Sequence, residues 1–228
     1  MSEALLRQST NLFDKLKLVN SSKPLSIDEQ FALVNETHPE IRYQLATRSD
    51  TNEGVLRALQ SDDKKIQNAI ERHPLINHII KYITSYQSDI NEQERFALHW
   101  NPGVRSALVS SSQTAPTVLE LLVFDSDVRV RKNLASNPRT PSKTLLQLGK
   151  DSSVSVRLKI TKRNDLSEVL YDLLAKDKSN KVVRQLLLSH GNKLNEKFKI
   201  SKNHSEKIEN LSDPNFLDIV SLRILHEQ

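Results

Sequence analysis

Aliphatic residues in the middle of the chain recur at a fixed interval. Val104, Val130 and Val156 stand about 26 residues apart, and each is followed four residues later by another aliphatic residue. That i, i+4 spacing places both side chains on one face of a helix. After a turn, a second aliphatic pair follows at i, i+3, as in Leu145 and Leu148. Each period therefore predicts two short helices that turn their apolar faces toward a shared core.

A period of this length is typical of repeat proteins, in which one helix pair cannot bury its apolar face alone and must stack on its neighbours. The pattern predicts an all-α solenoid of about six two-helix repeats in a single domain, 1–228. We expect an N-terminal cap region at 1–40, repeats at 41–190 and a C-terminal cap at 191–228. The predicted core columns of the first helices are Val104, Val130, Val156 and Val183, followed by Leu108, Leu134, Ile160 and Leu187.

The register of the repeats breaks near 88–103. The repeat before this segment has an extended second helix, from Pro74 to about Tyr86. Asn101 then resembles Asn137, which ends a first helix, but Val104 opens the next repeat at once. The segment is either an insertion or an overlapping half-repeat, and the sequence leaves both open.

Composition excludes several classes of function. The chain has 228 residues, of which 37% are hydrophobic and 27% charged, and its four glycines favour helices over a turn-rich β fold. It has no cysteine, which excludes disulfides, thiolate metal sites and cysteine nucleophiles. No run of about 18 apolar residues occurs, and the acidic residue near the start argues against a signal peptide. We therefore expect a cytoplasmic protein with no membrane partner.

Positive charge gathers in the second half of the chain. The net charge is +5, but residues 129–199 hold 17 basic and six acidic side chains, a net charge of +11. Such asymmetry favours an acidic partner, for example a nucleic acid, although a solvated charged surface is the alternative. Because few aromatic residues accompany these charges, stacking on single-stranded bases is not expected. The candidate binding residues, near helix starts and turns, are Lys132, Arg139, Lys159, Lys162, Arg163, Lys178 and Lys181.

Arginine and aspartate recur with the same period as the aliphatic residues. An arginine follows the first aliphatic position of most repeats, and an aspartate ends each repeat. We interpret them as a structural ladder of ion pairs that fixes the register between repeats, although a single exposed pair contributes only about 0.2–1 kcal/mol. The alternative is an arginine surface that binds phosphates. The predicted ladder comprises Arg105, Arg131, Arg157 and Arg184 with Asp125, Asp151 and Asp177.

The segment from Val130 to Asp151 combines Val-Arg, Asn-Pro, Thr-Pro and two leucines at i, i+3, and it resembles the leucine-rich repeat variant, a relative of HEAT-like α-solenoid repeats. The resemblance covers about 41–187 and is strongest over 104–177. It implies a right-handed superhelix with two short helices per repeat. Some members of that family carry an iron–sulfur cluster on an N-terminal cysteine cluster. Because this chain has no cysteine, we expect no cofactor and no metal.

Patterns that indicate an enzyme are weak, because neither an HExxH motif nor a Gly-rich phosphate loop occurs. The most unusual pair is His99 and Trp100. With a nearby carboxylate such as Glu94, it is similar to DNA glycosylases built from HEAT-like repeats, which use an aromatic cleft beside an acid. A tryptophan anchored in the core is the alternative.

We predict a non-enzymatic scaffold or binding module that binds a protein partner. The first alternative is binding of a nucleic-acid backbone through the basic half of the chain, and the second is a DNA glycosylase. The sequence leaves the identity of the partner and the oligomeric state open.

Overall fold

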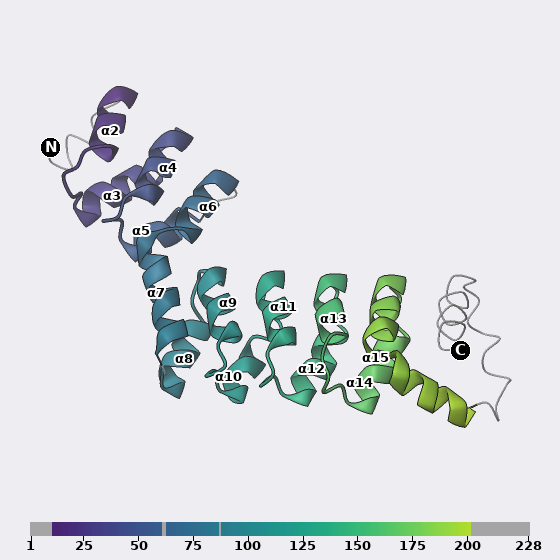
Figure 1. Cartoon of the computed structure of the whole chain (residues 1–228). Helices are drawn as coiled ribbons and strands as arrows, with labels where there is room; N and C mark the ends of the chain where they lie inside the picture. Colours follow the sequence, from purple (N-terminus) through teal and green to yellow (C-terminus); the bar gives the residue numbers. More distant parts are fainter. Residues whose placement is uncertain (1–10, 61–62, 87, 202–228) are drawn as a thin grey trace. The chain divides into compact units, whose positions relative to one another are not determined.

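The computed structural model describes residues 11–60, 63–86 and 88–201, and the side chains of these as far as 190 (Figure 1). Every regular element in these ranges is an α-helix, which confirms the prediction of an all-α fold. None of the described helices is long and apolar enough to cross a membrane. The start of the predicted N-terminal cap and most of the predicted C-terminal cap lie outside the described residues.

The chain forms two compact units, Met1–Arg139 and Thr140–Gln228. The described helices of the first unit are α2 (Leu12–Val19), α3 (Ile27–Val34), α4 (Pro39–Thr47), α5 (Glu53–Ala58), α6 (Lys64–Glu71), α7 (Pro74–Ser85), α8 (Ile90–Ala97), α9 (Pro102–Ser110), α10 (Pro116–Leu121) and α11 (Val128–Ser136). Those of the second unit are α12 (Ser142–Leu148), α13 (Val154–Ile160), α14 (Glu168–Ala175) and α15 (Asn180–Ser201).

Polar caps and prolines set where the helices begin. Ser26 forms a capping box with Glu29 at the start of α3, in which each side chain accepts a hydrogen bond from the other residue's backbone amide. Before α9, Oδ1 of Asn101 accepts a hydrogen bond from the Gly103 amide at 2.7 Å, and Pro102 occupies the first helical position. These local preferences divide the chain into short helices.

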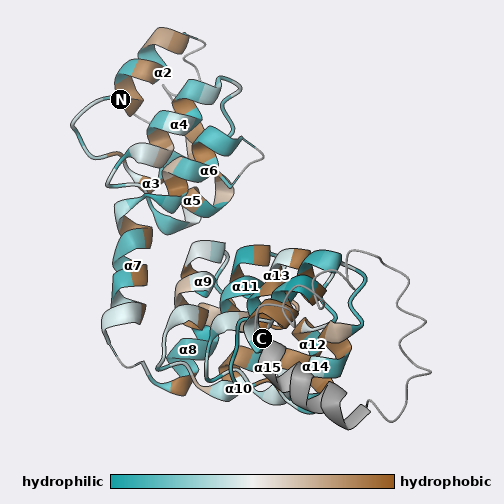
Figure 2. Ribbon diagram, turned by 45° about the vertical axis from the view of Figure 1, so that its right-hand side comes forward, coloured by the Kyte–Doolittle hydropathy of each residue, from teal (hydrophilic) through white to brown (hydrophobic). Residues whose placement is uncertain are grey.

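In the first unit, helices two places apart along the chain pack against each other, which arranges them in two rows (Figure 1). The first row contains α2, α4 and α6, and then α7, α9 and α11. The second row contains α3 and α5, and then α8 and α10. Figure 2 shows hydrophobic positions concentrated where neighbouring helices meet. The core of the first unit therefore lies between the rows, where Ile41, Leu45, Val104 and Leu108 are buried.

Two runs of alternating helices meet at α6 and α7, with no second-row helix between them. The second run starts with α7, which is 12 residues long and packs against α9 in the first row. Residues 88–103, where the sequence predicts an irregularity, form α8 and the start of α9, which are ordinary members of the second run. The departure from the repeat lies at α6 and α7, because α7 occupies a first-row position where the sequence predicts a second helix.

The second run corresponds to the first at a constant offset. The helices α8, α9 and α10 begin and end 63 residues after α3, α4 and α5. Buried glutamines correspond as well, since Gln30 and Gln93 each donate to a carbonyl five residues earlier and to another 20 residues later. Each also accepts a hydrogen bond from an amide 22 residues later, at 2.8 Å. One set of helices and contacts therefore occurs twice within the first unit.

In the second unit, α13 packs against α15, and α12 packs against α14. Val182 and Leu186 of α15 are 0% and 1% exposed, whereas Val183 and Leu187 are half-buried. The prediction that Val183 and Leu187 continue the core columns is therefore wrong by one residue, and the spacing of the columns stays constant. The stretch 182–188 begins with two successive valines and ends with three successive leucines, so the local hydrophobic pattern alone fits either register.

Candidate functional site

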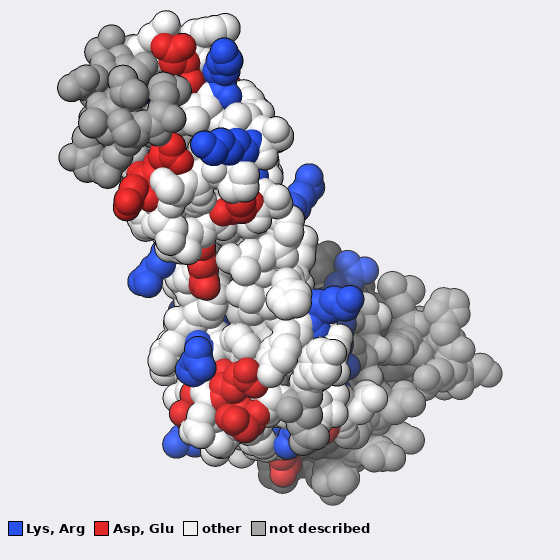
Figure 3. Space-filling model, turned by 90° about the vertical axis from the view of Figure 1, so that its left-hand side faces the viewer, with Lys and Arg blue, Asp and Glu red and all other residues white. Residues whose placement is uncertain are grey.

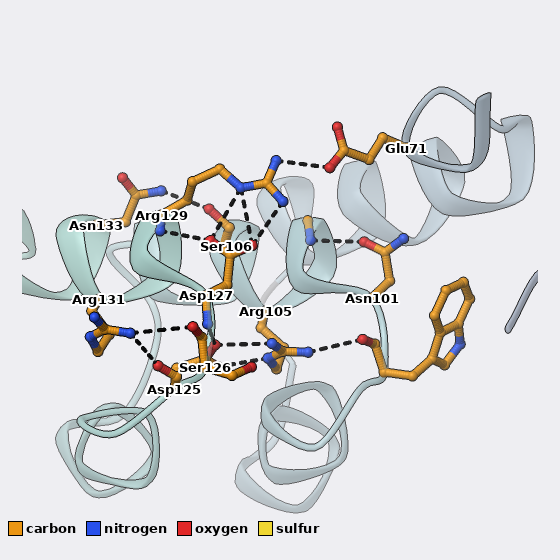
Figure 4. Close-up of polar contacts among 12 residues, drawn as sticks. Glu71, Asn101, Arg105, Ser106, Asp125, Ser126, Asp127, Arg129, Arg131 and Asn133 are labelled. Carbon is orange, nitrogen blue, oxygen red and sulfur yellow. Dashed lines mark hydrogen bonds and ion pairs between the residues drawn. The ribbon is translucent and has the colours of Figure 1, made fainter. Parts of the chain in front are cut away.

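The ladder arginines bind a carboxylate and the backbone together. Nε and Nη2 of Arg105 donate to the two carboxylate oxygens of Asp125, at 2.6 and 2.9 Å (Figure 4). Arg157 makes the same bidentate pair with Asp177, 20 residues later, at 2.5 and 2.9 Å. The two aspartate side chains are only 3% and 5% exposed. Hydrogen bonding to Asp177 raises the pKa of Arg157 above its ordinary value, which keeps this pair charged.

The same arginine column also binds the turns between helices. Nη1 of Arg131 donates to the Asp125 carbonyl six residues earlier at 2.6 Å, and Arg42 binds the corresponding carbonyl of Glu36. These carbonyls lie in the turns that follow the second-row helices α10 and α3. Each such arginine of a first-row helix therefore holds the turn that leads into its own helix. This contact supports the structural interpretation of the column over a phosphate-binding one.

Among the described residues, Arg184 makes no ion pair of the ladder that the sequence predicts. Because the core spacing is constant as far as Val182 and Leu186, the residue that corresponds to Arg157 is Val183, which cannot form an ion pair. Arg184 itself is exposed. The predicted Asp151 lies in a turn, where its Oδ1 accepts a hydrogen bond from the Ser153 amide at 2.8 Å.

Three of the seven predicted binding residues are partly buried or contact neighbouring parts of the protein. Arg163 is only 8% exposed and pairs with Asp165 at 2.6 Å, so it is not the surface cation that the sequence predicts. Its guanidinium lowers the pKa of Asp165 below the usual value. Arg139 is exposed but donates to the Ser112 carbonyl at 3.1 Å, and Lys132 is half-buried on α11.

The other predicted cations lie on or next to α13 and α15 of the second unit. Lys162, in the turn just after α13, and Lys181, on α15, are exposed, and these two helices pack against each other. Lys159 is half-buried on α13, and Lys178 is exposed in the turn before α15. By contrast, the face drawn in Figure 3 intersperses lysine and arginine with aspartate and glutamate. We define the α13–α15 surface as Leu158, Lys162, Lys181, Arg184 and Leu188.

His99 and Trp100 share one carboxylate, and it belongs to Glu53 of α5 rather than to Glu94. Trp100 donates from Nε1 to Glu53 Oε1 at 3.0 Å, and Nε2 of His99 lies 3.0 Å from the same oxygen. The two rings stack with their centroids 5.4 Å apart. Trp100 also packs against the buried core of the first run, which includes Ile70. The pair thus joins the turn between α8 and α9 to helices of the first run.

A second contact joins the two runs of the first unit. Arg129 at the start of α11 pairs with Glu71 at the end of α6 at 2.8 Å and with Asp127 at 2.8 Å (Figure 4). Together with the Glu53 contacts, it spans the place where a second-row helix is missing. Since Arg129 is exposed, this ion pair contributes less to stability than the partly buried contacts of His99 and Trp100.

A set of polar contacts to the ends of earlier helices was not predicted from the sequence. Nη1 of Arg48 donates to a carbonyl at the end of α2 at 2.9 Å, and Nδ2 of Asn137 donates to one near the end of α9 at 2.6 Å. Nε2 of His190 contacts a carbonyl at the end of α13 at 3.0 Å. Each side chain thus binds the helix two places before its own. Because arginine, asparagine and histidine perform this role in turn, no column of one residue type reveals it.

Comparisons with protein-family models, with curated proteins and with solved structures find no match to this chain. The resemblance to the leucine-rich repeat variant therefore stays a prediction that rests on the residues quoted above. The function has to be argued from the geometry of the described residues.

Removal of a ladder arginine tests the structural role of the column. We expect Arg157→Ala to lower the free energy of unfolding by about 3–5 kcal/mol, because it leaves the buried carboxylate of Asp177 without its counter-ion. Arg184→Ala is the matched control and should change stability by less than about 0.5 kcal/mol. Urea unfolding followed by circular dichroism measures both. Equal effects of the two substitutions would contradict the assignment.

The His99 contact makes stability depend on pH. Burial lowers the pKa of His99 below its ordinary value of 6.5 and outweighs the opposing effect of Glu53. The unfolded chain therefore binds this proton more readily, so the contribution of His99 is complete above pH 6.5 and is lost as the pH falls through the folded-state pKa. We expect the parent to lose more stability than His99→Gln when unfolding is measured at about pH 7.5 and about pH 5. An identical loss in both proteins argues against this contribution.

Proposed function

We propose that the chain is a right-handed α-solenoid of about six two-helix repeats, and that it acts as a non-enzymatic scaffold for a protein partner. The alternation of helices between two rows and the return of the same contacts at constant offsets support the architecture. In a stack of this kind every helix pair adds outward-facing positions to a continuous surface. Such surfaces suit the binding of extended or helical partners.

The observation that carries the proposal is the exposure of large apolar side chains at corresponding positions of neighbouring helix pairs. Leu98 after α8 is 83% exposed and Phe124 after α10 is 75% exposed, and these two helices pack together. Leu121, the last residue of α10 and three residues before Phe124, is 57% exposed. Adjacent exposed apolar groups are a feature of protein interfaces, where aromatic and aliphatic side chains provide the central contacts. A nucleic-acid backbone offers such side chains no apolar surface.

Binding of a nucleic-acid backbone is the second candidate. Lys162 just after α13 and Lys181 and Arg184 on α15 favour it, since exposed cations bind phosphates and release counter-ions. The glycosylase alternative gains no support from the tryptophan and its carboxylate, because Glu53 accepts the hydrogen bond from Trp100 and holds the ring against the core.

A nuclease-controlled capture experiment tests the proposal. The full chain is immobilised and exposed to an extract of its source cells, with and without prior digestion of DNA and RNA. We expect the same stoichiometric protein partner in both samples, because apolar contacts do not depend on nucleic acid. If retention disappears after digestion, and log affinity for duplex DNA falls against log salt with a slope of about −0.9 per phosphate contacted, the chain is a nucleic-acid binder instead.

A matched pair of variants sharpens the capture experiment. Leu98→Ser combined with Phe124→Ser should reduce retention of the partner several-fold, because it removes the apolar contacts without opening the core. Ile27→Ser, which replaces a 54% exposed residue on α3, serves as the control and should retain the partner at the parent level. Equal retention by the double variant and the parent would show that these apolar residues do not carry the interaction.

A further inference from the structure

The outer faces of α13 and α15 form one surface on the second unit. On α13, Val156 and Ile160 are buried, so the helical geometry directs Leu158 away from the core, and Lys162 lies exposed in the turn that follows α13. The same geometry on α15 exposes the three members of the α13–α15 surface on that helix. Because the two helices pack side by side with their core residues in register, their outward residues are neighbours.

Among the described residues, the α13–α15 surface is cationic with no acid to neutralise it. Lys162, Lys181 and Arg184 are exposed, and none of them takes part in an ion pair with another described residue. The acids closest in sequence are held elsewhere, since Asp177 pairs with Arg157 and Asp165 pairs with Arg163. The surface thus presents three positive charges that are available to a partner.

Two leucines distinguish this surface from a phosphate-binding one. Leu188 is 52% exposed on α15, and Leu158 is half-buried on α13. By the 26-residue spacing of the buried positions, Leu188 of α15 corresponds to Lys162 just after α13, and Arg184 of α15 corresponds to Leu158 of α13. Apolar and cationic side chains therefore alternate across the surface. A nucleic-acid backbone would bring polar phosphates against the leucines, whereas an amphipathic helix can place apolar residues on them and carboxylates on the cations.

We infer that the α13–α15 surface binds an acidic amphipathic helix of a partner protein. This inference rests on the proposed function and adds to it the location of a binding site and the chemistry of its occupant. Leucine-like residues at i, i+3 or i+4, and i+7 of the partner contact Leu158 and Leu188. Carboxylates beside them pair with Lys162, Lys181 and Arg184, which selects acidic partners and speeds their association.

The probe for this site is a fluorescein-labelled helical peptide with leucines at i, i+3, i+4 and i+7 and glutamates at the flanking positions. Anisotropy titration with the full chain should show saturable binding. A peptide of the same pattern with lysine in place of glutamate should bind at least tenfold more weakly. Lys162→Glu combined with Lys181→Glu should weaken binding of the acidic peptide at least tenfold, and Leu188→Ser should weaken it several-fold.

Lys143→Glu is the matched control, because Lys143 is an exposed lysine on α12 and lies outside the surface. It should change the affinity less than twofold. Thermal melting of all variants should match the parent, since every substituted side chain is exposed. Equal affinity for the acidic and the basic peptide, or no effect of Leu188→Ser, overturns the inference. Tighter binding of a 20-base-pair duplex, insensitive to Leu188→Ser, assigns the surface to nucleic acid and also overturns it.

The inference and the proposed function fail in different ways. If the nuclease-resistant partner is retained equally by the parent and by Lys162→Glu combined with Lys181→Glu, the scaffold function stands and this site is excluded. If retention of every partner is lost after nuclease digestion, the protein-binding function itself fails.

Discussion

Hydrogen bonds from side chains to backbone groups at helix ends hold neighbouring helix pairs together. An α-helix leaves its last four carbonyl groups without a partner inside the helix, so helices of six to nine residues expose a large share of their backbone. A buried carbonyl or amide without a partner costs about 1–3 kcal/mol. A stack of such short helices therefore depends on side chains that reach these groups. In the first unit, Asn137 reaches a carbonyl near the end of α9, and Gln93 and Arg105 bind carbonyls in the turns next to helix ends.

This constraint separates the residues that build the protein from those available to a partner. Arg105, Arg157 and His190 are polar enough to bind ligands, but their hydrogen-bonding groups contact neighbouring parts of the chain. Outward positions are free of that requirement and vary in character. The position of the exposed Phe124 corresponds, one period later, to the exposed Lys150. The same internal contacts can thus support apolar and charged binding surfaces on different parts of one chain.

Periodic features of the fold could be predicted from the sequence, and features without a period could not. The burial of Val104 and Val156 and the Arg157–Asp177 pair could be predicted, because these residues recur with the aliphatic spacing. The contacts of Gln93 were missed, because glutamine usually lies at the surface and its partners are distant backbone atoms. The row occupied by α7 and the burial of Arg163 depend on which helices pack together, and local patterns do not encode that.

Hydrogen exchange at one backbone amide tests the central role of these contacts most directly. The Ala115 amide donates to Oε1 of Gln93 at 2.8 Å, while the Leu119 amide donates to the Ala115 carbonyl within the first turn of α10. In Gln93→Leu, which keeps the volume of the side chain but removes the acceptor, we expect the Ala115 amide to exchange at least tenfold faster relative to Leu119 than in the parent. An unchanged ratio of the two exchange rates would contradict it.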